Sequence, residues 1–536
     1  MRRMRRPRVL TLVVSLLLTT GCVTDGGESP RGSGEDEDVK PRLVIAAGAD
    51  TNRVEPPSRA NVAMGYGDAN APVFEPLVRM APDFSVQPLL ATSWEFRSPA
   101  TWRFRLRENV RFHNGAPLDA EAVVYNVRDL WAAERSNILG VDASSARAVD
   151  DLTVDITPRQ PNYRMVEQLV HPSFGIRAPG TYAGLGTTSE NTPTGTGQYR
   201  FAAYRQGEAL EVERFDGYWG QKARTPMIAV RFLPESGARV QALEAGDVDA
   251  MYDFPREQVP AYADHRRVRT VKSTVGAYAA LLLNRHGSPP YDILGDRRVR
   301  QALASGIDRA TIVDNVWKGG AEVMSTVVPA PVLGPYASTV RGFPYDRQQA
   351  QRLLEEAGWT VGGDGVRTKA GRRLELTMLV GSVQDLTPAP ELVQAQLRQI
   401  GVDVKLDVPS TPAIYFERLE KGQGDIFAEA GNQHDANPIF LGALFTEATG
   451  GFPEYGRAFG AGPEYDRLFT EALGTPDGGR ARRLAADAMR LAVDESISAV
   501  PIAGISRFWG LRGNVRGFDP HPSSVNQRWA DTYVAT

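Results

Sequence analysis

The clearest pattern of apolar and polar positions lies between residues 94 and 125. Apolar side chains stand at every second or nearly every second position, with arginines between them: Trp102, Phe104, Leu106, Val110 and Phe112. This is the period of half-buried strands whose long charged side chains face water. A turn at His113-Asn114-Gly115 follows, and Asp119 is placed to cap the N-terminus of a helix that continues through AEAVVYNVRDL.

Other segments predict a mixture of strands and helices. The runs from Tyr278 to Asn284 and from Ser498 to Ile502 are almost continuously apolar, which suits strands covered on both faces. Gly246 closes a short predicted helix that begins near Val240, and residues 345–359 form an amphipathic helical pattern. The predicted elements therefore include both strands and helices.

The N-terminus has the pattern of an export signal. The first eight residues carry five arginines and no acid, and about a dozen apolar and small residues follow, too few to span a bilayer. The stretch ends at Gly21-Cys22, which resembles the lipobox of bacterial lipoproteins. Residues 1–21 are therefore expected to be a signal peptide, and Cys22 the lipidated first residue of the mature chain. A secreted protein with an incidental cysteine is the alternative.

Composition narrows the possible classes of function. Residues 22–41 are rich in Gly, Ser and acids and predict a flexible acidic tether. Cys22 is the sole cysteine, so neither a disulfide framework nor an all-cysteine metal site is available. The chain has 61 basic and 64 acidic side chains, a balance that argues against nucleic-acid binding. The body beyond the tether is too long for one ordinary core.

The segment described first resembles the signature of the family 5 extracellular solute-binding proteins, the peptide, nickel and oligosaccharide receptors of bacterial ABC importers. The aromatic strand, the turn and the capped helix occur in the family's order. Further segments along the chain are similar to motifs of the same family: Phe74 to Val78, Pro193 to Phe201, Tyr218-Trp219, Val240 to Asp249, Asp296 to Leu303 and Ala350 to Trp359.

The resemblance implies an α/β protein with a two-lobed periplasmic-binding-protein-like fold, mixed sheets and a hinge between the lobes. Lobe one is expected over residues 42–277, with an extra N-terminal subdomain at about 74–200. Lobe two is expected over residues 278–501, and residues 502–536 return to lobe one. A solute held between the lobes favours the closed form because it contacts both lobes at once.

The resemblance also implies where the solute binds. Residues 425–438 read as a strand followed by a polar loop, similar to the loop of peptide receptors in which an aspartate pairs with the peptide's α-ammonium. Asp435 occupies that position, while Asn432 replaces the family's tryptophan and Asn437 a later aspartate. We predict a ligand site at Asn432, His434, Asp435 and Asn437. Asp435 capping its own loop is the alternative.

The predicted function is that of an extracytoplasmic, membrane-anchored and monomeric receptor that delivers a peptide to an ABC permease and ATPase. An opine, an oligosaccharide or a nickel chelate is the alternative solute, and binding of a partner protein for signalling or chaperoning is the alternative class. The six histidines show no close ligand spacing, so no metal and no cofactor are expected. No catalytic motif occurs, and an enzyme is not expected.

Overall fold

The computed structural model describes most of the chain beyond the N-terminal segment. The described residues are 38–48, 73–97, 100–132, 139–180, 193–381, 388–433, 435–438, 441–447, 453–523 and 526–536. The predicted signal peptide, Cys22 and His434 lie outside them. Everything below concerns the unit from Val39 to Thr536.

A seven-stranded mixed sheet forms the centre of what we call lobe one. Its order is β12 (Val268–Lys272), β22 (Phe508–Arg512), β11 (Ala250–Tyr252), β1 (Arg42–Ala47), β10 (Met227–Phe232), β9 (Ala209–Arg214) and β8 (Tyr199–Arg205). β1 pairs in parallel with β10 and with β11, and the other pairs are antiparallel. Helix α5 (Ser236–Ala245) packs on this sheet and ends at Gly246, whose φ of 87° confirms the predicted C-terminal cap.

A six-stranded mixed sheet forms the centre of lobe two. Its order is β14 (Ala321–Val323), β21 (Ala499–Ile505), β13 (Ala277–Leu283), β20 (Ile426–Asn432), β18 (Glu375–Val380) and β19 (Asp403–Asp407). Every residue of β13 and β21 is buried, as the continuous apolar runs predict. The two strands are antiparallel neighbours at the middle of the sheet.

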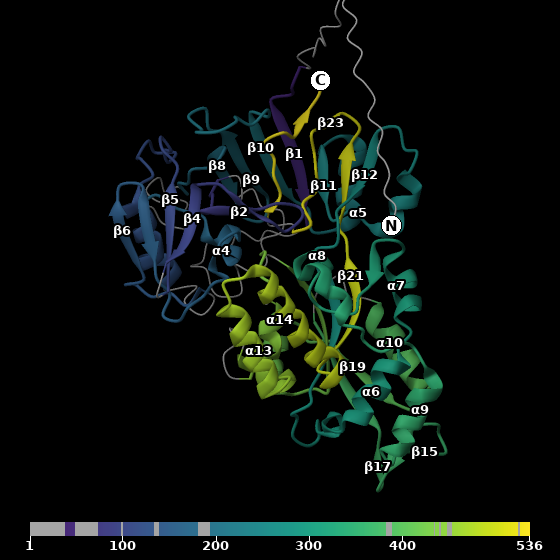
Figure 1. The fold of residues 1–536 in the computed structure, drawn as a ribbon. Helices are drawn as coiled ribbons and strands as arrows, with labels where there is room; N and C mark the ends of the chain where they lie inside the picture. The colour runs from purple at the N-terminus through teal and green to yellow at the C-terminus, as the bar shows by residue number, and fades with distance from the viewer. Residues whose placement is uncertain are drawn as a thin grey trace, which may run out of the picture. The chain divides into compact units, whose positions relative to one another are not determined.

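Helices cover both faces of the lobe two sheet. One apolar cluster joins the sheet to α6 (Arg297–Gly306), α7 (Arg309–Trp317), α9 (Arg347–Glu356) and α10 (Ala389–Arg398). The cluster on the opposite face includes α8 (Ala330–Leu333), α11 (Pro412–Glu420), α12 (Pro453–Phe459), α13 (Pro463–Leu473) and α14 (Gly478–Arg490). Figure 1 shows α13 and α14 side by side.

A four-stranded antiparallel sheet forms the subdomain, with the order β4 (Ala91–Arg97), β5 (Thr101–Leu106), β7 (Thr153–Ile156) and β6 (Ala146–Asp150). It carries α1 (Ala120–Asn126), α4 (Met165–Gln168) and the hairpin of β2 (Val78–Met80) and β3 (Val86–Pro88). The Asp119 carboxylate accepts a hydrogen bond from the Ala122 N–H at 2.8 Å, which confirms the predicted N-cap. The chain ranges expected for the two lobes and the subdomain stay a prediction.

The strand predicted through Val110 and Phe112 is wrong in its second half. β5 ends at Leu106, and Asn109 takes a φ of 61°, which turns the chain. Val110 and Phe112 are nevertheless buried, because they belong to the same apolar cluster as the buried side chains of β5. Burial at alternate positions continues past the end of β5. This pattern alone therefore cannot distinguish a strand from a well-packed turn.

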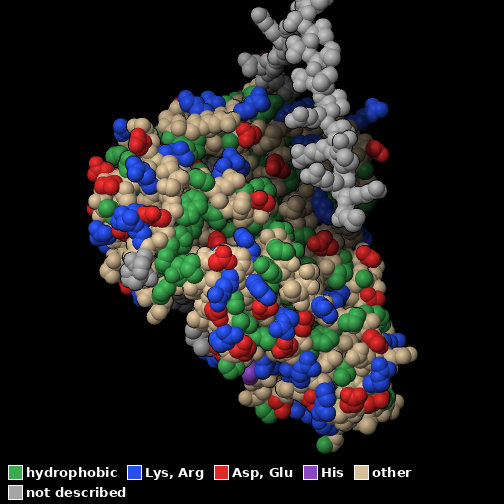
Figure 2. Space-filling model, in the orientation of Figure 1, with side chains coloured by type: hydrophobic (Ala, Val, Ile, Leu, Met, Phe, Trp, Pro, Cys, Tyr) green, Lys and Arg blue, Asp and Glu red, His purple; other side chains and the backbone are tan. Residues whose placement is uncertain are grey.

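Smaller elements complete the fold. They are the strands β15 (Thr360–Val361), β16 (Arg367–Lys369), β17 (Arg372–Arg373), β23 (Val515–Arg516) and β24 (Tyr533–Val534), and short 3₁₀ or π segments at residues 127–131, 172–174, 256–262, 293–295, 334–339, 441–445 and 491–495. Of the helices described here, none has the length and apolar character needed to cross a bilayer. Acidic and basic side chains are interspersed on the face that Figure 2 shows.

Candidate functional site

Two neighbouring strand connections join the sheets of the two lobes. One runs from β12 into β13 and the other from β21 into β22. The Ser273 N–H donates to the carbonyl of Arg507 at 2.9 Å, and the Arg507 N–H donates to the Ser273 hydroxyl at 2.9 Å. A Cβ added at Gly276 would lie 2.0 Å from the carbonyl oxygen of Pro522, so only glycine lets the C-terminal segment pack against this crossing. We call residues 273–276 and 506–507 the hinge.

Arg507 links the hinge to both lobes. Its side chain is 6% exposed. One guanidinium nitrogen donates to Asn432 Oδ1 at 3.3 Å, at the end of β20, and another lies 3.7 Å from Asp253 Oδ1 in lobe one. The sequence interpretation chose Asn432 but missed Arg507 and Asp253. The one available signal was the polar pair Ser506-Arg507 between two buried strands.

The loop after β20 brings two of the predicted ligand residues, Asp435 and Asn437, together around Gln433. Gln433 is fully buried, and its Nε2 donates to the Asp435 carbonyl at 2.9 Å, to Asp435 Oδ1 at 3.1 Å and to the Asn437 carbonyl at 3.1 Å. The Asn437 N–H donates to Asp435 Oδ1 at 3.0 Å. Asp435 therefore caps its own loop, which was the alternative role for it. A capping carboxylate can still bind a cation through its other lone pairs.

Asp435 lies near a second acid, Glu167 of the subdomain, which is partly buried and has a side chain that is 20% exposed. The Ala436 N–H donates to the Glu167 carbonyl at 3.0 Å, which brings the loop onto helix α4. Burial raises the pKa of Asp435 well above its usual value, and the nearby Glu167 raises it further. Burial also raises the pKa of Glu167 to about 7. Two carboxyl groups in one desolvated place cannot both ionise cheaply.

Arg164 compensates part of this negative charge. Its guanidinium donates to Glu167 Oε1 at 2.7 Å and to the carbonyls of Thr475 at 3.0 Å and Pro476 at 3.2 Å. The other Glu167 oxygen, Oε2, is buried without a hydrogen-bond partner among the residues described. No Lys or Arg in the described part of the chain forms an ion pair with Asp435. The loop, α4 and Arg164 thus tie the subdomain to lobe two around an excess of buried acid.

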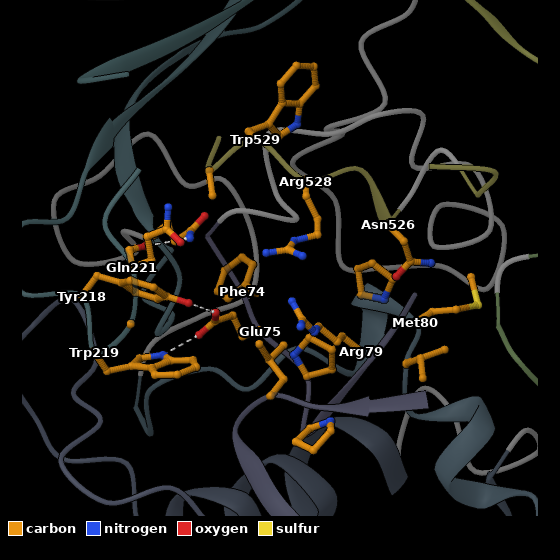
Figure 3. A pocket seen from close by; sticks show the side chains of 18 of the residues that line it. Phe74, Glu75, Arg79, Met80, Tyr218, Trp219, Gln221, Asn526, Arg528 and Trp529 are labelled. Atoms are coloured by element: carbon orange, nitrogen blue, oxygen red, sulfur yellow. Dashed lines mark hydrogen bonds between the residues drawn. The ribbon is translucent and has the colours of Figure 1, made fainter. Parts of the chain in front are cut away.

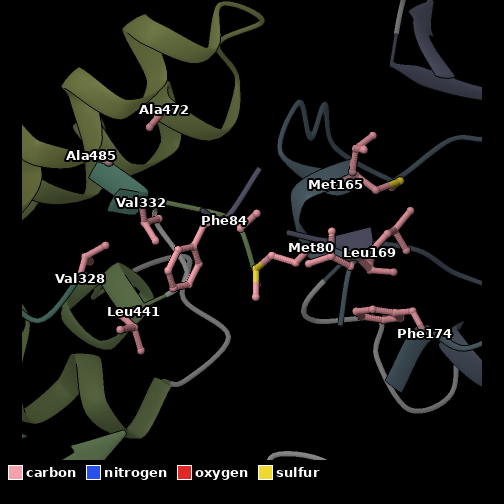
Figure 4. Close-up of a cluster of buried hydrophobic side chains, with 14 of the residues drawn as sticks. Met80, Phe84, Met165, Leu169, Phe174, Val328, Val332, Leu441, Ala472 and Ala485 are labelled. Carbon is pink, nitrogen blue, oxygen red and sulfur yellow. The ribbon is translucent and has the colours of Figure 1, made fainter. Parts of the chain in front are cut away.

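An apolar contact joins the subdomain to lobe two beside these polar groups. Met80 and Phe84, on the β2–β3 hairpin, belong to the same buried cluster as Val328, Val332 and Leu441 of lobe two. Figure 4 shows the Phe84 ring between these lobe two side chains and Met80. The hairpin and the loop after β20 therefore both contribute to closing one lobe upon the other.

The described residues contain no group of three or more His, Cys, Asp or Glu side chains that could hold a metal ion. His434, which was predicted as a ligand contact, is outside those residues.

Comparison with known proteins identifies the family. Residues 85–452 match the model of the bacterial extracellular solute-binding proteins, family 5 Middle. The nickel-binding periplasmic protein of Escherichia coli is 29% identical over 82% of this chain and 84% of its own length. A glutathione-binding protein of Pectobacterium atrosepticum is 26% identical over 90% of this chain and 91% of its own length.

Solved structures agree with this assignment. NikA from Brucella suis, in complex with Fe(III)-EDTA, superposes with a TM-score of 0.79 at 25% identity and covers 92% of this chain and 100% of its own. DppA from Helicobacter pylori, in complex with the peptide STSA, shares the fold with a TM-score of 0.73 at 22% identity over 92% of this chain and 98% of its own. The chain therefore belongs to the bacterial extracellular solute-binding proteins of family 5, the receptors that deliver solutes to ABC importers.

Proposed function

We propose that this receptor captures a short peptide or a similar amino-acid-derived zwitterion, with the solute's ammonium group on Asp435. The observation that carries the proposal is the buried Asp435 beside the partly buried Glu167, for which Arg164 supplies one bonded guanidinium. A buried carboxylate without a cationic partner is costly, and an entering ammonium supplies the missing charge. Glutathione and the peptide STSA, named for two of the similar proteins, both belong to this chemical class.

The hinge supplies a cation for the other end of such a solute. Arg507 lies beside Asn432, at the start of the loop that carries Asp435. A planar guanidinium suits the carboxylate of a zwitterion. A solute that contacts both lobe one and the Asp435 loop of lobe two would favour the closed form. The closed form is the one that the importer would recognise.

Replacing Asp435 by asparagine tests the proposed ammonium site. We expect D435N to bind trialanine with a Kd about tenfold to a hundredfold higher than wild type, because the amide keeps the loop hydrogen bonds but carries no charge. N-acetyl-trialanine, which lacks the ammonium, should bind wild type and D435N equally weakly. Isothermal titration calorimetry measures both.

Asp314→Asn is the matched control, because Asp314 is exposed on α7 in lobe two, remote in sequence from the loop. Trialanine binding should be unchanged in this variant. Equal affinity of wild type for the free and the acetylated peptide would contradict the ammonium site.

A metal chelate is a second candidate solute, favoured by the similarity to the nickel-binding protein. Because the described residues offer no metal cluster, the chelator would carry most of the ligands. Metal analysis of the purified protein distinguishes this case: nickel present in proportion to protein, with no peptide bound, would replace the peptide proposal. Neither candidate involves catalysis, and the similar proteins are named for binding nickel and glutathione.

We propose that the mature chain begins at Cys22 and is held at the extracytoplasmic face of the membrane by lipid on that residue, as a monomer. The support is the apolar segment that ends at Gly21-Cys22. In the native host, Cys22→Ala should move the protein from the membrane fraction to the soluble fraction. Equal retention of wild type and C22A in the membrane would exclude the lipid anchor.

A further inference from the structure

A cavity of about 340 Å³ lies between lobe one and the subdomain, apart from the site above. Its walls come from the segment before and through β2, the end of β3, and the loops at residues 218–221 and 526–530. None of its lining residues belongs to the lobe two sheet or its helices. A molecule bound in this cavity would contact the subdomain and lobe one. It would not contact the loop of lobe two that carries Asp435.

The one acid in the wall of this cavity is already satisfied. Glu75 is 7% exposed and accepts hydrogen bonds from the Tyr218 hydroxyl at 2.7 Å, Trp219 Nε1 at 3.0 Å and the Thr196 hydroxyl at 3.0 Å. Figure 3 shows the first two of these bonds. Burial raises the pKa of Glu75, while these three bonds act to lower it. This carboxyl fixes the wall and offsets part of the charge of Arg107 and Arg79, so that one acid faces three arginines and positive charge remains in excess.

Three arginines surround the same space. Arg107 donates from Nε to the Leu89 carbonyl at 3.1 Å, and its guanidinium carbon lies 4.4 Å from the ring centre of Trp219. Figure 3 shows the guanidinium groups of Arg79 and Arg528 turned toward the same open space. Among the described residues, none of the three arginines forms an ion pair with an Asp or Glu.

Arg79 and Arg528 repel each other across the cavity. Burial lowers the pKa of Arg79, and the charge of Arg528 lowers it further. The Arg79 Nε is buried without a hydrogen-bond partner in the described structure. Glu75 and Tyr218 offset only part of this cost, because they act to raise the pKa of Arg79 while its net shift is still downward. An anion between the two guanidinium groups removes the repulsion while accepting their hydrogen bonds.

We propose that this cavity binds a small anion that bears a phosphate or carboxylate group, held by Arg79 and Arg528. Guanidinium groups match both oxyanions through paired N–H donors. The aromatic rings of Phe74 and Trp529 line the remaining volume, which exceeds that of the charged group alone and accommodates an organic body. This anion site is independent of the identity of the transported solute.

Calorimetric titration with inorganic phosphate and, separately, with citrate tests the proposal, with sodium chloride keeping the ionic strength constant. We expect saturable one-to-one binding of at least one anion at millimolar concentration. Binding of phosphate alone identifies a phosphate site, and binding of citrate alone identifies a carboxylate site. Absence of binding by both anions overturns the proposal.

Arg528→Gln is the informative variant because Arg528 is exposed and its removal should leave the fold intact. Its affinity for the bound anion should fall about tenfold. Arg266→Gln removes the same charge from an exposed position outside the cavity and should leave the affinity unchanged. An equal loss of anion affinity in both variants would show a non-specific charge effect and overturn the site. The affinity for trialanine should be unchanged in both variants.

Discussion

Phe84→Ala is expected to lower the free energy of unfolding by about 3–5 kcal/mol, the range for removing a buried phenylalanine ring. Phe84 is 5% exposed and lies in the cluster that joins the β2–β3 hairpin to Val328, Val332 and Leu441. The cavity left by the ring would lie between the subdomain and lobe two, so the variant should also favour a more open form. Urea unfolding measures the stability, and small-angle X-ray scattering measures the opening as a larger radius of gyration.

The backbone at Phe84 provides a matched control. Its φ of 63° is in the left-handed region, which costs a residue with a Cβ about 1 kcal/mol relative to glycine. Phe84→Gly should therefore be about 1 kcal/mol more stable than Phe84→Ala, although both lose the same ring. Phe416→Ala, at a ring that is 40% exposed on α11, should have little effect. A Phe84→Ala protein with wild-type stability and dimensions would refute the proposed role of the hairpin.

Glu167→Gln is expected to remove a large pH dependence of stability. Burial raises the Glu167 pKa from 4.5 to about 7, so the folded protein holds this proton more tightly than the unfolded chain. Between these two values the native state binds more protons, and the free energy of unfolding falls as the pH rises. The raised pKa of Glu167 contributes its full stabilisation below pH 4.5, and this contribution is lost by about pH 7. The free energy of unfolding therefore falls by about 3 kcal/mol over this range.

Several charged groups face Glu167 and set the design of this experiment. Glu167 raises the pKa of Asp435, while Arg164 and Arg482 lower the pKa of Glu167 against the larger effect of burial. Asp425 and Glu429 also have pKa values raised to about 7 by burial, so wild-type stability will depend on pH for more than one reason. The difference between wild type and E167Q, measured by urea unfolding from pH 4.5 to 7.5, isolates Glu167. Parallel pH profiles for the two proteins would contradict the raised pKa.

Local features of the fold could be predicted from the sequence because they depend on neighbouring residues. The cap at Asp119, the helix end at Gly246 and the fully buried strands β13 and β21 follow from side-chain chemistry and spacing. The error at Val110 and Phe112 arose because a turn can bury alternate side chains as a strand does.

The candidate site could be predicted only in part, because its charges come from distant segments. The loop with Asn432, Asp435 and Asn437 was identified, and its contact with a solute remains a proposal. Glu167 and Arg507 are far from this loop in sequence, and the polar pair Ser506-Arg507 is the one local sign of either. Their importance depends on the packing of the subdomain and the hinge against lobe two.

Native mass spectrometry of the protein purified from its own host tests the central claim most directly. The lipid-free form should carry small molecules between the lobes, which denaturation releases for identification. We predict a series of short peptides, or one amino-acid-derived zwitterion, that is retained by wild type and lost from D435N. A bound metal chelate without a free ammonium group, retained equally by wild type and D435N, would contradict the proposed role of Asp435.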